Sequence, residues 1–298
     1  FLALYTFAAM FFQALTRNKF IGMLATIAFA IINVAIGTFG LEHALINFGG
    51  QALASYSDMN GYGHFLTAYL WVKTYWVLFG LLLLIAASIL MVKGNETSLG
   101  KRCTSGRRQM GKGLRILSLV CLTFFISIGS YIFYNTNILN QYQNTAEGLK
   151  FKADYEKTLK RFEYLPQPKI TDVKLQVELY PKTGDYTAQG YYILTNKLKE
   201  PIYKIYLQKP LGSEINLEEV NFGREVFLDK HYNQYGFYIY TLKKALQGGE
   251  AVKMKFKQTY ITKGFKENDS NSSVLQNGTF LTNKAFPTLG YSKEYELD

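Results

Sequence analysis

Three uncharged apolar runs, each about 20 residues long, constrain this chain most, because a helix of that length crosses the hydrocarbon core of a bilayer. The runs are 20–41, 74–92 and 116–134, and a shorter one occupies 1–15. Before residue 135 the acidic residues are Glu42, Asp58 and Glu96 alone. We predict membrane-spanning helices near 1–15, 20–41, 66–92 and 116–134. Buried helices of a large soluble protein are the alternative that this pattern disfavours.

The distribution of positive charge orients these helices, because Lys and Arg near helix ends stay on the cytoplasmic side. Residues 20–72 contain no Lys or Arg, whereas 93–115 carry Lys93, Lys101, Arg102, Arg107, Arg108, Lys112 and Arg115. We expect 93–115 to face the cytoplasm of a bacterial cell and the chain after about residue 135 to lie outside its inner membrane. The net charge of +11 is then mainly a topology signal, and we expect no nucleic-acid partner.

Two polar features interrupt the apolar half. Lys73 lies beside Trp71 and Trp76, where a lysine ordinarily extends to the membrane interface, although a functional lysine inside the membrane is the alternative. The outward stretch 57–64, Ser-Asp-Met-Asn-Gly-Tyr-Gly-His, is typical of a tight turn. A proton or metal pair of Asp58 and His64 is its alternative interpretation.

The second half changes period. Apolar residues at helical spacing between 144 and 166 predict a linking helix that ends at Pro166 and Pro168. From Ile170 the period is two, and the alternation returns near 202, 237 and 252 between Gly- and Pro-containing turns. We therefore predict an α-helical transmembrane bundle of about four helices, the first one truncated, over 1–143. An antiparallel β-sandwich or saddle outside the membrane follows over 168–298.

Catalytic motifs are absent from the sequence. The glycines at 94 and 100 do not have the spacing of a phosphate-binding loop, and His43, His64 and His231 cannot form a His-Glu-x-x-His zinc helix. The carboxylates Glu218, Glu219, Glu294, Glu296 and Asp298 have no partner base in the sequence pattern, so we interpret them as surface charge. We expect no catalytic or metal-binding residue here. Because the chain opens on Phe1 inside an apolar run and stops at Asp298, we expect it to be part of a longer protein.

Several short motifs resemble a known family. Pro168–Val173, Gly190-Tyr191-Tyr192, Asn196-Lys197-Leu198, Gly248-Gly249-Glu250 and Asn277-Gly278-Thr279-Phe280 resemble the N-terminal β-saddle domain of aminopeptidase N-type zinc peptidases, the gluzincins. Together with the motif of residues 57–65, the apolar half resembles the permease part of bacterial ABC-type permease/aminopeptidase fusion proteins. The resemblance covers nearly the whole chain.

The resemblance implies that this chain is a membrane anchor and saddle domain, and that zinc and the catalytic residues belong to a following domain. Asn277, Gly278, Thr279 and Phe280 would then line the cleft that receives a peptide substrate. The Gln-x-Glu segment that holds the substrate amine in that family is missing, since no Glu lies between Gln276 and Lys293.

Two other functions remain open. The chain could be a non-catalytic transport component whose peptidase-like domain is a binding or scaffold module. A separate ABC ATPase subunit would then dock on Lys101, Arg102, Arg107 and Arg108. A purely structural surface anchor in the lipid bilayer is the third hypothesis.

Overall fold

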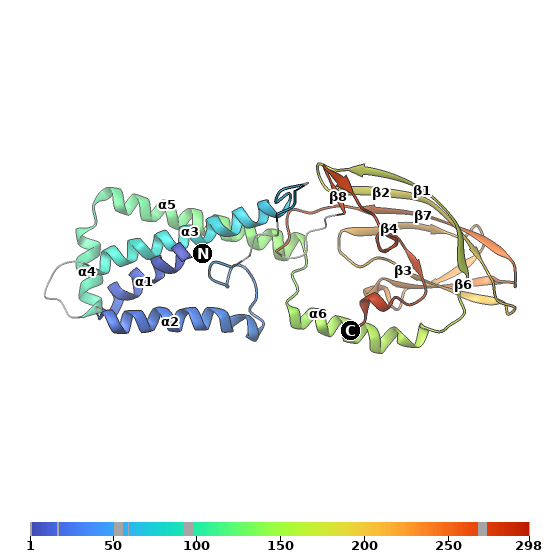
Figure 1. Cartoon of the computed structure of the whole chain (residues 1–298), viewed down its shortest axis with the longest axis horizontal. Helices are drawn as coiled ribbons and strands as arrows, with labels where there is room; N and C mark the ends of the chain where they lie inside the picture. Colours follow the sequence, from blue (N-terminus) through green and yellow to red (C-terminus); the bar gives the residue numbers. More distant parts are fainter. Residues whose placement is uncertain are drawn as a thin grey trace. The chain divides into compact units, whose positions relative to one another are not determined.

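The computed structural model describes residues 2–16, 18–50, 56–58, 60–91, 98–267 and 273–297. The chain forms two compact units. The first, here called the helical unit, comprises 1–145 together with 265–270, and the second, the β unit, comprises 146–264 and 271–298 (Figure 1). The division at 145 lies next to the predicted boundary at 143. Residues 265–267, within the stretch 168–298, belong to the helical unit.

The helical unit contains α1 (Leu2–Thr16), α2 (Lys19–Ala35), α3 (Phe65–Leu90), α4 (Leu99–Gln109) and α5 (Lys112–Phe133). A 3-10 turn (Ile36–Phe39) extends α2, and a π-helical turn (Tyr134–Leu139) extends α5. Three described stretches are long and apolar enough to cross a membrane, namely Lys19–Phe39, Phe65–Leu90 and Lys112–Leu139. The prediction of a helical region with long apolar helices is thus confirmed. The helix predicted over 20–41 ends earlier, because Gly40 adopts a φ of 77°.

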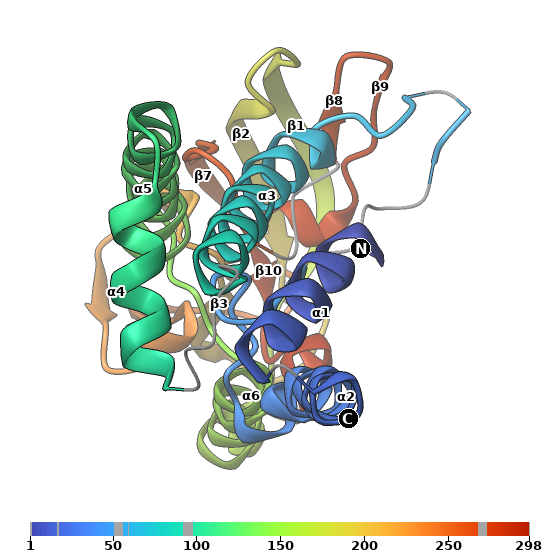
Figure 2. The same cartoon turned by 90° about the vertical axis from the view of Figure 1, so that its left-hand side faces the viewer.

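Helix α3 is the centre of this unit, and it packs against α1, α4 and α5 (Figure 2). Glycines let the backbones approach closely: a Cβ on Gly80 would lie 2.5 Å from the Phe7 ring of α1, and one on Gly129 of α5 would lie 3.0 Å from the Tyr75 ring. Large apolar side chains point outward on α2 and α5, with Leu24 and Leu119 more than half exposed. The unit therefore has an apolar exterior as well as an apolar core.

The β unit contains two four-stranded antiparallel sheets and a small hairpin. Their strands are β1 (Lys169–Tyr180), β2 (Asp185–Thr195), β3 (Ile202–Gln208), β4 (Ile215–Asn221), β5 (Val226–Asp229), β6 (Phe237–Leu246), β7 (Ala251–Tyr260), β8 (Val274–Leu275), β9 (Gly278–Thr279) and β10 (Thr288–Leu289). One sheet has the order β1-β2-β7-β4 and the other β10-β3-β6-β5, while β8 pairs with β9. The prediction of antiparallel sheets after the helices is confirmed.

Alternation along the strands builds the core between the two sheets. In β7, Val252, Met254 and Phe256 are buried while Lys253 and Lys255 are exposed. They pack with apolar residues of β2, β3 and β6 in one cluster. Strand β1 is an edge strand, in which Val173 is 52% exposed while Leu175 packs partly buried against this cluster. It has a strand neighbour on one side only.

Helix α6 (Thr145–Leu159) and the 3-10 turn Lys160–Phe162 occupy the predicted linking segment 144–166. Tyr155 and Leu159 are fully buried against Tyr206, Phe237 and Ile239 of the β3–β6 sheet. This sheet is therefore covered by apolar side chains on both faces. This packing makes the linking helix a brace of the β unit.

Candidate functional site in the loop between α2 and α3

The loop that follows α2 enters the helical unit instead of running over its surface. Ala44 and Phe48 are 2% exposed and belong to the core of the bundle. The Phe48 ring makes edge contacts with Tyr5, Phe29 and Trp76 at centroid distances of 5.1 to 5.3 Å. Non-helical backbone buried in an apolar core requires partners for its N–H and C=O groups inside the protein.

Polar side chains of the apolar helices supply those partners. Asn33 accepts the Phe48 N–H at 2.7 Å and donates to the Phe48 carbonyl at 3.2 Å. The Trp76 indole donates to the Ala44 carbonyl at 2.9 Å. Lys73 Nζ donates to the carbonyls of Gly49 and Gly50 at 2.7 and 3.0 Å. Lys73 thus binds the entering loop, which neither sequence interpretation of this lysine specified.

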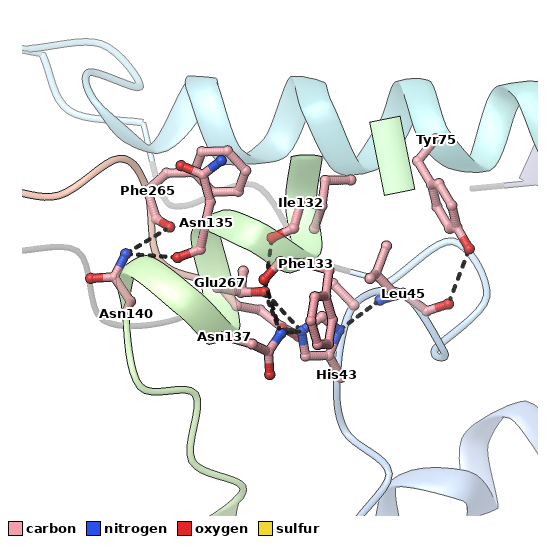
Figure 3. A network of polar contacts seen from close by, with 12 residues as sticks. His43, Leu45, Tyr75, Ile132, Phe133, Asn135, Asn137, Asn140, Phe265 and Glu267 are labelled. Carbon is pink, nitrogen blue, oxygen red and sulfur yellow. Dashed lines mark hydrogen bonds and ion pairs between the residues drawn. The ribbon is translucent and has the colours of Figure 1, made fainter. Parts of the chain in front are cut away.

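His43 is the centre of a polar cluster at the start of this loop (Figure 3). Its Nδ1 accepts the Leu45 N–H at 3.2 Å. Its Nε2 lies 3.0 Å from Thr136 Oγ1 and 2.9 Å from the side-chain amide of Asn137. Since Nδ1 is an acceptor, a neutral His43 carries its proton on Nε2 and can donate it to Thr136 Oγ1, whose own hydroxyl donates to the Ile132 carbonyl at 2.9 Å. The π-helical turn after α5 brings Thr136 and Asn137 to the same imidazole although they are consecutive residues.

Glu267 joins the same cluster from the segment between β7 and β8. Its Oε2 lies 3.6 Å from His43 Nε2, and the two side chains are 6% and 11% exposed. The Ala44 N–H donates to the Glu267 carboxyl group, and the carboxylate of Glu42 is close enough to repel it. Burial, as the main cause, and Glu42 together raise the pKa of Glu267 to about 7, whereas burial lowers the pKa of His43. The cluster can therefore hold a proton near neutral pH.

A second group of contacts holds the same segment. Asn140 donates to the Phe265 carbonyl at 3.3 Å and to the Asn135 carbonyl at 2.9 Å. The Phe265 ring is 9% exposed, belongs to the core of the helical unit and lies 6.0 Å from the Tyr131 ring. Residues 265–267 are consequently attached at both of their ends.

The predicted cleft residues lie elsewhere, on the small hairpin of the β unit. Asn277 is in its turn, Gly278 and Thr279 form β9, and all three are exposed. Phe280 is 77% exposed. The structure brings these four residues together on one surface loop, and their role in lining a cleft stays a prediction.

The predicted docking residues lie on α4. Lys101, Arg107 and Arg108 are exposed, but Arg102 is only 5% exposed. The Arg102 guanidinium donates to the carbonyls of Ala14, Leu15 and Leu90. It therefore completes the C-terminal ends of α1 and α3, whose last carbonyls have no partner within their own helix. Arg102 is thus a structural residue, and the exposed docking set is reduced to the other three.

The turn formers at 57–64 do form a turn. The Ser57 N–H donates to the Gly61 carbonyl at 2.9 Å, and Gly61 and Gly63 have φ values of 58° and 50°. Asp58 is exposed and His64 precedes α3, where its ring contacts Phe65; Met59 is outside the described residues. Among the residues that the structure describes, no three His, Cys, Asp or Glu side chains are grouped as metal ligands.

A hollow of about 420 Å³ lies on the β1-β2-β7-β4 sheet. It is lined by Lys174, Leu175, Gln176, Gln189, Gly190, Tyr191, Glu219, Lys255, Phe256 and Lys257. Tyr191 pairs with Lys174 on one side and Lys255 on the other, and Lys253 Nζ lies 3.7 Å from the centre of its ring. Lys257 pairs with Glu218 at 2.7 Å. The charged side chains around the hollow are therefore mostly cationic.

Sequence reasoning missed the His43–Glu267 cluster. One signal was present, since Asn135, Thr136 and Asn137 form a polar run directly after an apolar span. Glu267 had no comparable signal, because it is one of many charged residues in the second half. No protein-family model matches the sequence, and no curated protein sequence is significantly similar to it.

Proposed function

We propose that this chain is the membrane anchor and N-terminal saddle domain of a membrane-bound aminopeptidase-like protein joined to an ABC-type permease. The observation that carries the proposal is the combination, in one chain, of three helices of membrane-spanning length with a two-sheet antiparallel sandwich. The apolar exterior of α2 and α5 supports a lipid environment for the helical unit. The lipid bilayer is then the first partner of the chain.

In this proposal the described residues anchor and position, and they carry out no chemistry themselves. His43, His64 and His231 belong to three separate places, the loop after α2, the residue before α3 and the turn after β5. They do not fit a zinc site, so zinc and the hydrolytic residues are assigned to a domain outside this chain. The saddle would form one wall of the cleft that admits a peptide, with residues 277–280 at its rim.

The test uses the longer gene product that contains this chain. Purified in detergent, it should contain about one zinc ion per protein and release amino acids from aminoacyl reporter substrates. A chelator should remove both the metal and the activity, and zinc should restore them. A product that binds no zinc and leaves the reporters intact would exclude the enzymatic proposal.

The lysine-lined hollow favours a second function, in which the β unit is a binding module of a transport component. Lysines at 253, 255 and 257 of β7 are spaced like alternate side chains of an extended peptide. We propose an acidic extended peptide as the ligand of this surface. The exposed Lys101, Arg107 and Arg108 of α4 would then face a separate ATPase subunit.

Fluorescence anisotropy with a labelled peptide that has Glu at alternate positions tests the binding function. Lys174→Glu and Lys255→Glu should weaken binding severalfold and reduce its dependence on salt. Lys244→Glu, an exposed charge reversal on β6, is the matched control and should leave binding unchanged. Equal loss in all three variants would mean that only the net charge of the protein matters.

A further inference from the structure

Residues 265–267 lie in the chain between β7 and β8, yet every contact described for them is made within the helical unit. Phe265 is in the apolar core, its carbonyl accepts from Asn140, and Glu267 meets His43 and the Ala44 N–H. The first two contacts do not depend on pH. The third joins two ionisable side chains that are both almost completely buried, so its strength depends on where their protons are.

Three observations indicate that the pair is uncharged when the segment is in place. His43 Nδ1 accepts the Leu45 N–H, and an imidazolium, which carries protons on both nitrogens, would lose that hydrogen bond. The separation of 3.6 Å between His43 Nε2 and Glu267 Oε2 is longer than the 2.7 to 2.9 Å typical of a charge-assisted bond. The carboxylate of Glu42 disfavours a second negative charge at Glu267.

The other neighbours whose contacts with the pair are described are uncharged or negative. Thr136 and Asn137 from the turn after α5 are neutral, and the Tyr142 ring packs against His43 at a centroid distance of 4.7 Å. The Glu42 carboxylate acts on the Glu267 carboxyl group and is negative. In such surroundings the cost of removing two charges from water can exceed the attraction between them.

We propose that residues 265–267 are a proton-linked latch, in which closing transfers one proton from the His43 imidazolium to the Glu267 carboxylate. When the segment is released, both side chains are hydrated and charged in mildly acidic solution. When it closes, the imidazole N–H bond breaks, an O–H bond forms on the carboxyl group, and no proton is exchanged with solvent. The latch thus buries two neutral groups in place of an ion pair.

The two side chains bias the latch in opposite directions. Because burial raises the pKa of Glu267 from 4.5 to about 7, its contribution to closure weakens as the pH rises through that range and is constant above it. Because burial lowers the pKa of His43 below 6.5, its contribution weakens as the pH falls below 6.5. In the pH range where both groups titrate, the pH dependence of closure due to Glu267 is opposite to that due to His43. With both residues present, the stability of the closed latch should therefore change little with pH.

Hydrogen exchange of residues 265–267 in the purified full chain tests this assignment, with each variant compared with wild type at the same pH. In Glu267→Gln only the pH dependence that His43 causes remains. Release of the segment should therefore increase as the solution is acidified below about pH 6.5. In His43→Gln only the pH dependence that Glu267 causes remains. Release of the segment should therefore increase roughly tenfold for each pH unit by which the pH rises between about 4.5 and 7. Wild type should change less than either variant.

Glu225→Gln, which removes an exposed carboxylate of the β unit, is the matched control and should follow wild type. Slopes of the same sign in the two single variants, or a wild-type slope as steep as that of either variant, would overturn the latch. Infrared difference spectra of wild type provide a check that needs no folded variant. A protonated carboxyl band that disappears near pH 7 is expected, and its absence would show that Glu267 is ionised in the closed state and refute the proposal.

Discussion

At the scale of single residues, the helical unit uses polar side chains to hold a piece of irregular backbone inside an apolar bundle. Lys73 is the clearest case, because it is the only charged residue in α3 and its ammonium group binds the carbonyls of Gly49 and Gly50. Together with Asn33 and Trp76 it satisfies the loop that carries Phe48 into the core. These residues bind the loop, and Lys73 does so from a helix that is otherwise uncharged.

Lys73→Met should therefore destabilise the protein. The substitution keeps the length of the side chain but leaves two carbonyls without their donor, at a cost of about 1 to 3 kcal/mol for each group that stays buried. Thermal unfolding in detergent should show a lower midpoint, and proteolysis within residues 43–50 should become faster. Lys112→Met, at the exposed start of α5, is the control, and equal midpoints for the two variants would contradict the assignment.

At the scale of elements, α6 shows how a helix of modest apolar content is stabilised by the sheet beneath it. Tyr155 is fully buried, stacks on Tyr291 at 5.2 Å, and shares its hydroxyl with Gln208 and the Ser292 carbonyl. The helix thereby covers the outer face of the β3–β6 sheet and joins the chain near residue 292 to it. Its loss would uncover one face of the sandwich.

Tyr155→Ala should lower the free energy of unfolding of the β unit by about 3 to 5 kcal/mol, since it removes a large aromatic group from a packed core. Tyr155→Phe keeps the ring and should cost only about 1 kcal/mol, which is typical of a lost hydrogen bond. Denaturant titration of the full chain measures both, with the exposed Lys152→Ala on the same helix as the control. A larger loss for the Phe variant than for the Ala variant would show that the hydroxyl dominates.

At the scale of the whole molecule, the topology of the chain can be tested with its own cysteines. Cys103 is exposed on α4 and Cys121 is buried in α5. If α4 faces the cytoplasm, a membrane-impermeant maleimide should label Cys103 in inside-out vesicles and not in intact cells. In a Cys103→Ser background, Thr183→Cys on the exposed β1–β2 turn should show the opposite pattern. Labelling of both sites from one side would contradict the predicted orientation.

Local patterns allowed much of this architecture to be predicted. The apolar spans and the alternating strands could be recognised because a helix that faces apolar surroundings and a strand that is buried on one face both repeat within a few residues. Helix α4 was missed because its composition is polar and charged. This helix spans Leu99–Gln109. It is anchored in part by Arg102, which donates hydrogen bonds to the carbonyls of Ala14, Leu15 and Leu90 on other helices.

The sequence by itself determined which parts of the chain are helical and apolar and which alternate as strands, since those properties depend on neighbours along the chain. Only the tertiary structure decided that Lys73 and Asn33 hold an entering loop, that Arg102 is buried, and that His43 meets Glu267. These contacts join residues far apart in sequence, and no periodicity records them. Their chemistry depends on burial, which raises the pKa of one group and lowers that of the other only after the chain has brought them together.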